Sequence, residues 1–196
     1  MARSTDRGRR PALQALGLAE AAVDRLDPYL RLLAAWNRRV NLTAAHTAAD
    51  QVALLIARVI PLAALLAPGE LIDVGSGNGS PGLVIAALEP DRPACLLEPR
   101  TRRWAFLREA ARAMGRPDIR VLRCRHDAYP GPPAPNVTLR ALRLPLAELL
   151  PLLTPEGRIF VLGGPPDAGG PSLRTIAVPG QGAIHVLGRP DVSRET

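Results

Sequence analysis

The stretch Glu70-Leu71-Ile72-Asp73-Val74-Gly75-Ser76-Gly77-Asn78-Gly79-Ser80-Pro81-Gly82 decides the fold that we predict for this chain. Its first, apolar half is typical of a short buried strand, and a glycine-rich turn follows directly. Pro81 suits the first turn of a helix, where a backbone N–H has no intrahelical partner. The stretch therefore predicts a strand, a tight turn and a helix, the unit that binds nucleotide-like ligands in α/β proteins.

Two acidic residues lie at the ends of predicted strands. Asp73 lies in the strand before the glycine turn, and Glu98 follows a second apolar run, Ala94–Leu97. A carboxylate at a helix N-terminus repels phosphate, so this pattern favours a ligand that carries positive charge and a ribose. S-adenosylmethionine (SAM) is such a ligand. Asp73 would face its ammonium or sulfonium group, and Glu98 would accept hydrogen bonds from both ribose hydroxyls.

Residues Gly77–Gly82 also match the G-x-G-x-x-G pattern of dinucleotide-binding proteins. A nicotinamide coenzyme is therefore the alternative ligand, and Glu98 suits either one. Asp73 favours SAM, because a pyrophosphate would be repelled there. On this basis we expect Asp73, Gly77, Gly79 and Glu98 to contact SAM.

The hydrophobic periodicity of the chain changes near residue 67. Before it, apolar residues recur at helical spacing in Leu13–Leu18, Glu20–Trp36 and Gln51–Leu66, the last with a kink expected at Pro61. After it, strands alternate with helices, which implies a mostly parallel sheet. The predicted strands are Leu71–Val74, Ala94–Leu97, Ile119–Cys124, Asn136–Leu139, Arg158–Leu162 and a terminal antiparallel pair, Thr175–Val178 and Ala183–Leu187. The helices predicted among them are Pro81–Glu89, Thr101–Met114 and Leu144–Leu153.

We accordingly expect an α/β, Rossmann-like fold with a mostly parallel seven-stranded sheet, helices on both faces and an N-terminal helical extension. Residues 1–11 are expected to form a disordered basic tail, 12–66 the helical section, and 67–196 the SAM-binding domain. The ligand would lie at the carboxyl ends of the strands, near the point where the strand order switches.

The composition allows a packed core and suggests an anionic partner. Of the 196 residues, 47% are hydrophobic, the formal net charge is +7, and all 25 basic residues are arginine. Arginine matches phosphate oxygens, which favours a polyanion such as a nucleic acid. A solvated surface, in a protein from a GC-rich genome, is the other interpretation.

Cysteines and histidines give no sign of a metal site. Cys95 and Cys124 lie in apolar runs and are predicted to be small core residues, and the three histidines show no ligand spacing. No apolar run is long enough for a membrane span, and the first ten residues do not match a signal peptide. We therefore expect a cytoplasmic protein without a metal or membrane contact, and a monomer.

Five segments, in order between about residues 30 and 188, resemble the motifs of one family. Trp36–Thr43 is similar to "W-N-K-x-x-N-L-T", residues 73–82 to "D-V-G-[ST]-G-x-G-x-P-G", residues 96–107 to "L-L-[DE]-x-x-x-K-[RK]-x-x-F-L", Arg125 and Asp127 to "R-x-E", and Leu139-Arg140-Ala141 to "S-R-A". The family is the bacterial small-subunit ribosomal RNA guanine-N7 methyltransferase, also called glucose-inhibited division protein B.

The resemblance implies a class I, SAM-dependent methyltransferase that acts on a guanine in the 530 loop of 16S rRNA, free or in the small ribosomal subunit. Carried over by position, cofactor contacts would fall at Gly75, Ser80, His126, Asp127 and Arg140. Arg140 is also the best candidate for the catalytic residue, touching the methionine carboxylate or the target nucleotide; the alternative is a surface arginine after a strand.

Guanine N7 carries a lone pair and no proton, so in-line attack on the SAM methyl needs no general base. Positioning and electrostatics would then supply the rate. Phosphate contacts are expected along a rim of five arginines, with Trp36 either stacking on a base or packing in the core. The rim consists of Arg38, Arg39, Arg100, Arg102 and Arg103.

The chain departs from the family pattern in several places. The family usually has a His and an Asp where residues 54–59 lie, a lysine where Gly163 follows the fifth strand, and a serine in place of Leu139. With no lysine in the chain, some arginine must replace the missing one if activity is kept. The alternatives are a divergent or weakly active SAM- and rRNA-binding homologue, or a SAM enzyme that acts on another RNA or a small molecule.

Overall fold

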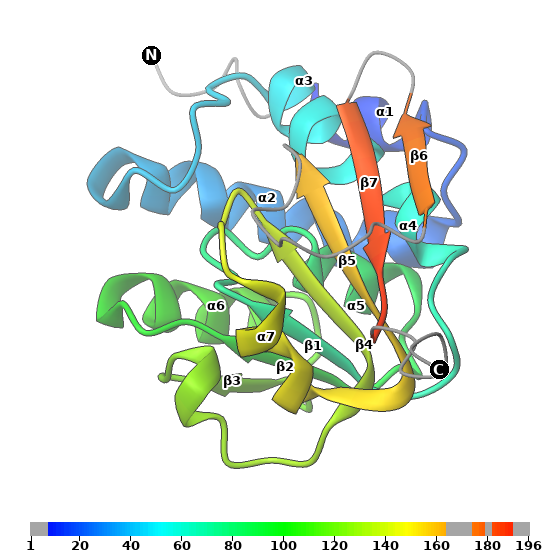
Figure 1. Cartoon of the computed structure of the whole chain (residues 1–196). Helices are drawn as coiled ribbons and strands as arrows, with labels where there is room; N and C mark the ends of the chain where they lie inside the picture. The colour runs from blue at the N-terminus through cyan, green and yellow to red at the C-terminus, as the bar shows by residue number, and fades with distance from the viewer. Residues whose placement is uncertain (1–7, 164–173, 179–181, 190–196) are drawn as a thin grey trace, which may run out of the picture.

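The computed structural model describes residues 8–163, 174–178 and 182–189, and its centre is one seven-stranded sheet (Figure 1). The strand order is β3-β2-β1-β4-β5-β7-β6, with the first five strands parallel and β7 antiparallel to both of its neighbours. The strands are β1 (Leu71–Val74), β2 (Ala94–Leu97), β3 (Arg120–Leu122), β4 (Ala134–Arg140), β5 (Leu153–Gly163), β6 (Arg174–Val178) and β7 (Gly182–Leu187). The predicted mostly parallel sheet and its terminal antiparallel pair are confirmed.

Helices cover both faces of the sheet, as predicted. One face carries α5 (Gly82–Leu88) and α6 (Thr101–Ala113), and the other carries the short α7 (Leu146–Leu149) with the 3₁₀ turn Leu150–Leu152. In β1, Leu71 belongs to the first face's cluster while Ile72 and Val74 belong to the second. Because both faces are buried, this strand appears in the sequence as a nearly continuous apolar run.

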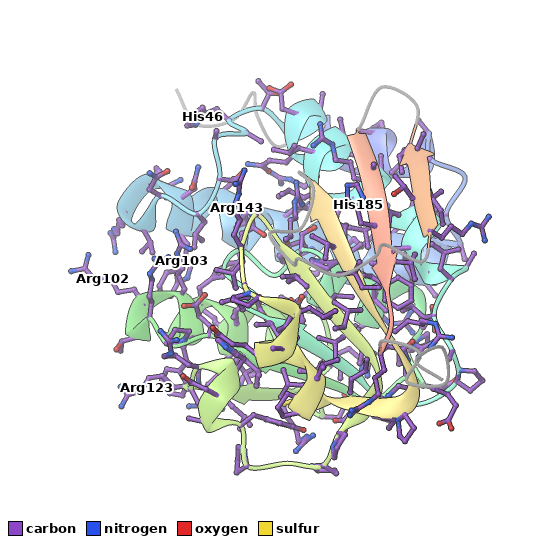
Figure 2. All side chains as sticks on the ribbon, viewed as in Figure 1. His46, Arg102, Arg103, Arg123, Arg143 and His185 are labelled. Atoms are coloured by element: carbon purple, nitrogen blue, oxygen red, sulfur yellow. The ribbon has the colours of Figure 1, made fainter. Side chains whose placement is uncertain are left out.

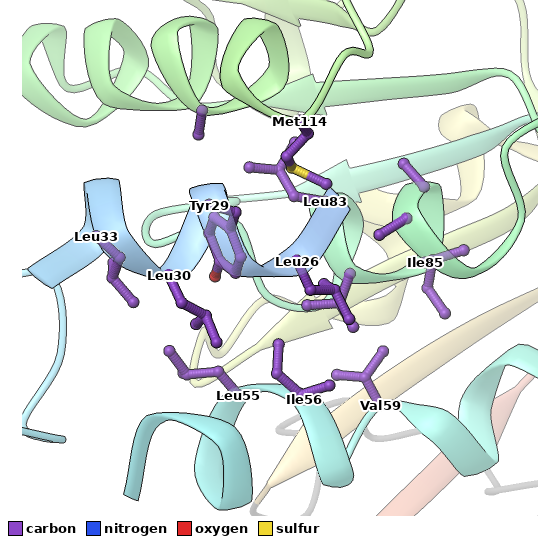
Figure 3. Packing of buried hydrophobic residues seen from close by; sticks show 14 of the residues in the cluster. Leu26, Tyr29, Leu30, Leu33, Leu55, Ile56, Val59, Leu83, Ile85 and Met114 are labelled. Carbon is purple, nitrogen blue, oxygen red and sulfur yellow. The ribbon is translucent and has the colours of Figure 1, made fainter. Parts of the chain in front are cut away.

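The N-terminal helices extend the first of these two cores. They are α1 (Arg9–Gln14), α2 (Glu20–Val40), α3 (Ala48–Gln51), the π-helix Val52–Ala57 and α4 (Ile60–Ala63). Figure 3 shows Leu26 and Leu30 of α2 facing Leu55 and Ile56, with Leu83 of α5 on the opposite side of α2. These residues form one buried cluster with the sheet, so the helical section and the sheet share a core.

Two sequence expectations need correction in this region. Helix α1 begins at Arg9, which is buried, so residues 9–11 are helical and are not part of a disordered tail; residues 1–7 lie outside the described part of the chain. The single helix expected over Gln51–Leu66 is three short pieces. It begins earlier because the Thr47 hydroxyl caps α3 by accepting from the Asp50 N–H at 3.1 Å. It breaks before Ile60, where α4 begins with Pro61 in its first turn. The glycine- and proline-rich stretch Gly163–Pro171 is also expected from the sequence to be a loop. Gly163 ends β5, and residues 164–171 lie outside the described residues.

One buried hydrogen bond joins the helical section to the glycine turn. The Tyr29 side chain in α2 is fully buried, and its hydroxyl donates to the Asn78 carbonyl oxygen at 2.8 Å. We expect Tyr29→Phe to lower the free energy of unfolding by about 1–2 kcal/mol, since the carbonyl loses its partner. Urea unfolding measures this change. Tyr129→Phe is the control, because Tyr129 is half-buried and its hydroxyl accepts from the exposed Arg120. An equal, small effect of both substitutions would contradict the assigned role of Tyr29.

Candidate functional site

A cavity of about 520 Å³ lies at the carboxyl ends of β1, β2 and β4, where the strand order switches. Its volume falls within the roughly 300–1,000 Å³ typical of small-molecule sites. The N-terminal helical section supplies one wall, and the strand ends and their loops supply the others. The lining residues are Leu42, Thr43, Leu54, Leu55, Val74–Asn78, Ser80, Leu97–Arg100, Arg103, Cys124–His126, Arg140–Leu142 and Leu144.

The glycine turn forms the floor of this cavity. Gly75 and Gly77 line the cavity. Their φ angles of +68° and +49° lie in the left-handed region of backbone conformation, which residues with a Cβ rarely adopt. A Cβ on Gly75 would also lie 2.9 Å from the Leu142 side chain. Gly79 has φ +91° but faces Leu83 and Tyr29, so it shapes the turn without lining the cavity.

Glu98 is the acidic residue that reaches the cavity. Its side chain is 3% exposed, with Oε2 accepting from the Gly77 N–H at 3.0 Å and Oε1 from the Arg100 N–H at 2.9 Å. Each carboxylate oxygen keeps a further lone pair, because an ionised carboxylate accepts about four hydrogen bonds. Glu98 is therefore held in place at the end of β2 and still able to accept from ligand hydroxyls.

Asp73 does not line the cavity, contrary to the prediction that it faces the ligand's positive groups. Its Oδ1 accepts from the Thr138 hydroxyl at 2.8 Å, and its Oδ2 accepts from the Gly82 N–H at 3.3 Å. Burial raises the pKa of Asp73 to about 6, although these hydrogen bonds act in the opposite direction. Asp73 thus fixes the start of α5 against β4 and shapes the site from beneath.

Ser80 and Arg140 connect the end of β4 to the helical wall. Arg140 donates from one guanidinium nitrogen to Ser80 Oγ at 2.8 Å and from the other to the Leu54 carbonyl at 2.9 Å. The Ser80 hydroxyl in turn donates to the Leu55 carbonyl at 2.7 Å. Both predicted residues therefore line the cavity, and burial lowers the pKa of the Arg140 guanidinium.

The wall from the N-terminal section was not assigned to the site by the sequence. Asn37 holds the turn after α2: its Oδ1 accepts from the Leu42 and Thr43 N–H groups at 2.6 and 2.9 Å, and its Nδ2 donates to the Thr43 carbonyl at 2.8 Å. Asn78 then donates to the Leu42 carbonyl at 3.2 Å. The available signal was the Trp36–Thr43 motif, whose two asparagines and threonine build this turn.

The two site residues predicted after β3, His126 and Asp127, lie in different positions relative to the cavity. His126 is buried, lines the cavity and lies with Nε2 2.8 Å from Glu148 Oε2. Asp127 is exposed, pairs with Arg125 at 3.2 Å and does not line the cavity. The structure therefore places His126 at the site and Asp127 outside its wall. The nearby Cys124 lines the cavity as a free thiol, like the buried Cys95 elsewhere in the core.

Only some of the five arginines predicted to form the rim border the cavity. Arg100 and Arg103 border the cavity, whereas Arg38, Arg39 and Arg102 are exposed outside it. Figure 2 shows Arg102, Arg103 and Arg123 on one flank of the molecule. Among the aromatic residues, Trp36 packs edge-on against Phe106 at 5.9 Å between ring centroids and donates to Glu109 at 3.0 Å. Trp36 thus joins α2 to α6. Of the two roles considered for it, base stacking and core packing, the structure shows packing.

Neither a membrane segment nor a metal cluster occurs in the described residues. No helix within them combines the length and the apolar character needed to cross a bilayer. No three His, Cys, Asp or Glu side chains in the same ranges are grouped to hold a metal ion.

Comparison with known proteins decides the family. A sequence model of the family described as rRNA small subunit methyltransferase G (GidB) matches residues 22–168. The chain belongs to this family. Its members are SAM-dependent rRNA guanine-N7 methyltransferases, and the resemblance seen in the five motifs is confirmed.

Individual relatives agree with the rRNA small subunit methyltransferase G family and with the fold. The chain is 38% identical over 147 residues to "Ribosomal RNA small subunit methyltransferase G" of Halorhodospira halophila, covering 73% of this chain and 70% of that one. A SAM-dependent methyltransferase from Aquifex aeolicus superposes with a TM-score of 0.56 at 16% identity, over 70% of this chain and 91% of that one. An RNA methyltransferase from Salinibacter ruber, solved with S-adenosyl-L-homocysteine, superposes with a TM-score of 0.54 at 20% identity, over 66% of this chain and 86% of that one. These structures show the class I methyltransferase fold.

The raised pKa of Asp73 predicts a specific pH dependence of stability. Its carboxyl titrates near its ordinary value in the unfolded chain and at about 6 in the folded one, so the folded state binds more protons between these values. Raising the pH from 4 to 7 should therefore lower the free energy of unfolding of the wild type by about 2 kcal/mol through this group, and this loss should be absent in Asp73→Asn. Urea unfolding at both pH values measures the difference.

Asp118→Asn is the control for this pH experiment. A hydrogen bond from Arg116 lowers the pKa of Asp118, so its removal should change the pH dependence in the opposite sense. Identical pH profiles for the wild type and Asp73→Asn would contradict the assignment.

Proposed function

We propose that this chain binds SAM in the 520 Å³ cavity and transfers its methyl group to N7 of a guanine in the 530 loop of 16S rRNA. The observation that carries the proposal is the fixed Glu98 carboxylate opposite the glycine turn in a chain of this family. The residues present fit SAM: Glu98 has lone pairs left for the ribose hydroxyls, and Gly75 and Gly77 present backbone without side chains. His126 would lie on the adenine side, near the end of β3.

Attack by N7 requires positioning and no general base, because N7 carries a lone pair and no proton. The bound cofactor supplies the methyl group, and the protein's contribution is to orient acceptor and donor with the reacting atoms about 3 Å apart. Arg140 is held by Ser80 and Leu54 at the cavity wall, where it can orient an anionic or carbonyl group. We propose that Arg140 is also the catalytic residue, because it borders the cavity at the end of β4, across the site from Glu98 at the end of β2.

RNA would approach over the flank of α6. Arg100 and Arg103 border the cavity, and the exposed Arg102 continues the cationic surface away from it. Trp104, next to Arg103, is itself covered by Arg108, whose guanidinium carbon lies 4.8 Å from the ring centroid. Arg38 and Arg39, in the last turn of α2, are further phosphate-binding candidates. The rRNA substrate makes the cytoplasm the proposed compartment, and we propose a monomer, which light scattering would test.

A methyl-transfer assay tests this function. Radiolabelled SAM is incubated with the protein and small ribosomal subunits from a strain that lacks the corresponding enzyme, or with free 16S rRNA. We expect label at N7 of one guanine in the 530 loop. SAM binding without transfer would instead support the weakly active homologue, which the absence of a lysine after β5 favours. Label on a small molecule or another RNA would contradict the proposed substrate.

Removal of the Glu98 charge should weaken cofactor binding. Glu98→Gln replaces a charge-assisted acceptor, an interaction worth about 1.5–3 kcal/mol, so the Kd for SAM should rise by ~10-fold or more. Titration calorimetry gives the Kd. Glu89→Gln is the matched control, since Glu89 pairs with Arg92 outside the cavity. Equal Kd values for the Glu98 and Glu89 variants would contradict the ribose contact.

Arginines of α6 should set the salt dependence of RNA binding. In the double variant Arg102→Gln/Arg103→Gln, the slope of log K against log salt should fall by about 0.7 for each lost phosphate contact. Arg158→Gln is the control, because Arg158 lies within β5, does not line the cavity and donates to the Glu156 and Gly157 carbonyls. If both proteins show the wild-type slope in filter binding to a 530-loop hairpin, the rim is wrongly placed.

A further inference from the structure

Arg58 is a cation whose side chain lacks a hydrogen-bond partner at its buried Nε. It follows directly after the π-helix Val52–Ala57, and the residue is only partly exposed. In the described part of the chain, Arg58 makes no ion pair. Burying part of a charged group without a partner costs free energy, so such a group in a native fold calls for an explanation.

Arg58 lies beside Arg140 at the carboxyl ends of β4 and β5. The two side chains border the same cavity of about 20 Å³, together with Leu162, Gly163 and the β6–β7 hairpin. This volume admits one oxygen-sized group. Because Arg140 also borders the 520 Å³ cavity, the Arg58–Arg140 pair lies at the edge of the proposed cofactor and substrate site.

Among the described residues, no carboxylate forms an ion pair with either arginine of this pair. Arg140 donates to a hydroxyl and to a backbone carbonyl, both neutral acceptors. Asp73 is the carboxylate that acts electrostatically on Arg140, and its own oxygens are engaged by Thr138 and Gly82. Arg58 and Arg140 instead repel one another, one of the causes that lower the pKa of Arg140.

We propose that Arg58 and Arg140 together bind an oxyanion at this edge of the site. The ligand is a carboxylate or phosphate group, from either the methionine part of SAM or the target nucleotide of the RNA. Two guanidinium groups match the oxygens of either anion by charge-assisted hydrogen bonds. Arg58 also supplies a cation beside Gly163, where the family pattern has a lysine. The identity of the oxyanion rests on the proposed function; the pairing of the two arginines does not.

Arg58→Gln and Arg58→Lys test the site, with Arg158→Gln as the control for loss of one arginine. Titration calorimetry is performed with SAM and with 5′-methylthioadenosine, which lacks the amino-acid carboxylate, and filter binding with a 530-loop hairpin at several salt concentrations. Thermal melting of the ligand-free proteins completes the set. Since Arg58 has no hydrogen-bond or ion-pair partner in residues 8–163, 174–178 and 182–189, we expect Arg58→Gln to melt at or above the wild-type temperature, as happens when a residue kept for binding is replaced.

Two binding results support the proposal and identify the anion. If the carboxylate of SAM is bound, Arg58→Gln weakens SAM at least tenfold and 5′-methylthioadenosine less than twofold. If an RNA phosphate is bound, SAM affinity is unchanged, while hairpin affinity falls at least fivefold and the salt slope falls by about 0.7. In either case the affinity of Arg58→Lys should lie between those of the wild type and Arg58→Gln, because lysine keeps the positive charge but lacks the planar guanidinium fork.

Four results would overturn the proposal. The first is wild-type affinity of Arg58→Gln for both SAM and the hairpin. The second is an equal loss for SAM and 5′-methylthioadenosine, and the third is a clearly lower melting temperature, both of which indicate a structural role. If Arg58→Gln does not fold, that also indicates a structural role. Failure of the wild type to methylate rRNA would refute the proposed function alone, because the comparison of SAM with 5′-methylthioadenosine still tests the arginine pair.

Discussion

The hydrogen bonds that tie the glycine turn to the N-terminal helices are the constraint on which the site depends. Tyr29 and Leu42 bond the backbone and side chain of Asn78, and Leu55 accepts from Ser80. A turn with three residues at positive φ has little local stability of its own, so it needs such fixed partners. The helical extension thereby becomes part of the candidate site, supplying one wall and holding the floor in place.

The cavity is electrostatically asymmetric. Glu98 provides a carboxylate at the end of β2, while Arg140, with Arg58 behind it, provides positive charge at the ends of β4 and β5. SAM suits this arrangement, since its ribose donates hydrogen bonds and its methionine part ends in a carboxylate. Asp73 contributes through the scaffold: it joins β1, β4 and the first turn of α5 beneath the cavity.

The sequence predicted the sheet well because its strands are short, apolar and bounded by glycine or proline, as for Leu71–Val74 and Ala94–Leu97. It failed where long-range packing decides the outcome. The π-helix Val52–Ala57 has no periodicity that distinguishes it from an α-helix. Asp73 was placed against the ligand, although alternation along the strand puts it on the face of Leu71, toward α5. Asp127 and His126 are adjacent in sequence, yet the contact that holds His126 comes from Glu148, which sequence spacing does not reveal.

A crystal structure of this chain with SAM bound would show whether Glu98 and the N-terminal wall hold the cofactor. We expect the nucleoside in the 520 Å³ cavity, both ribose hydroxyls within hydrogen-bond distance of the Glu98 carboxylate, and Leu42 and Thr43 in contact with the ligand. A ligand bound away from Glu98, or without contact to the N-terminal wall, would contradict this expectation.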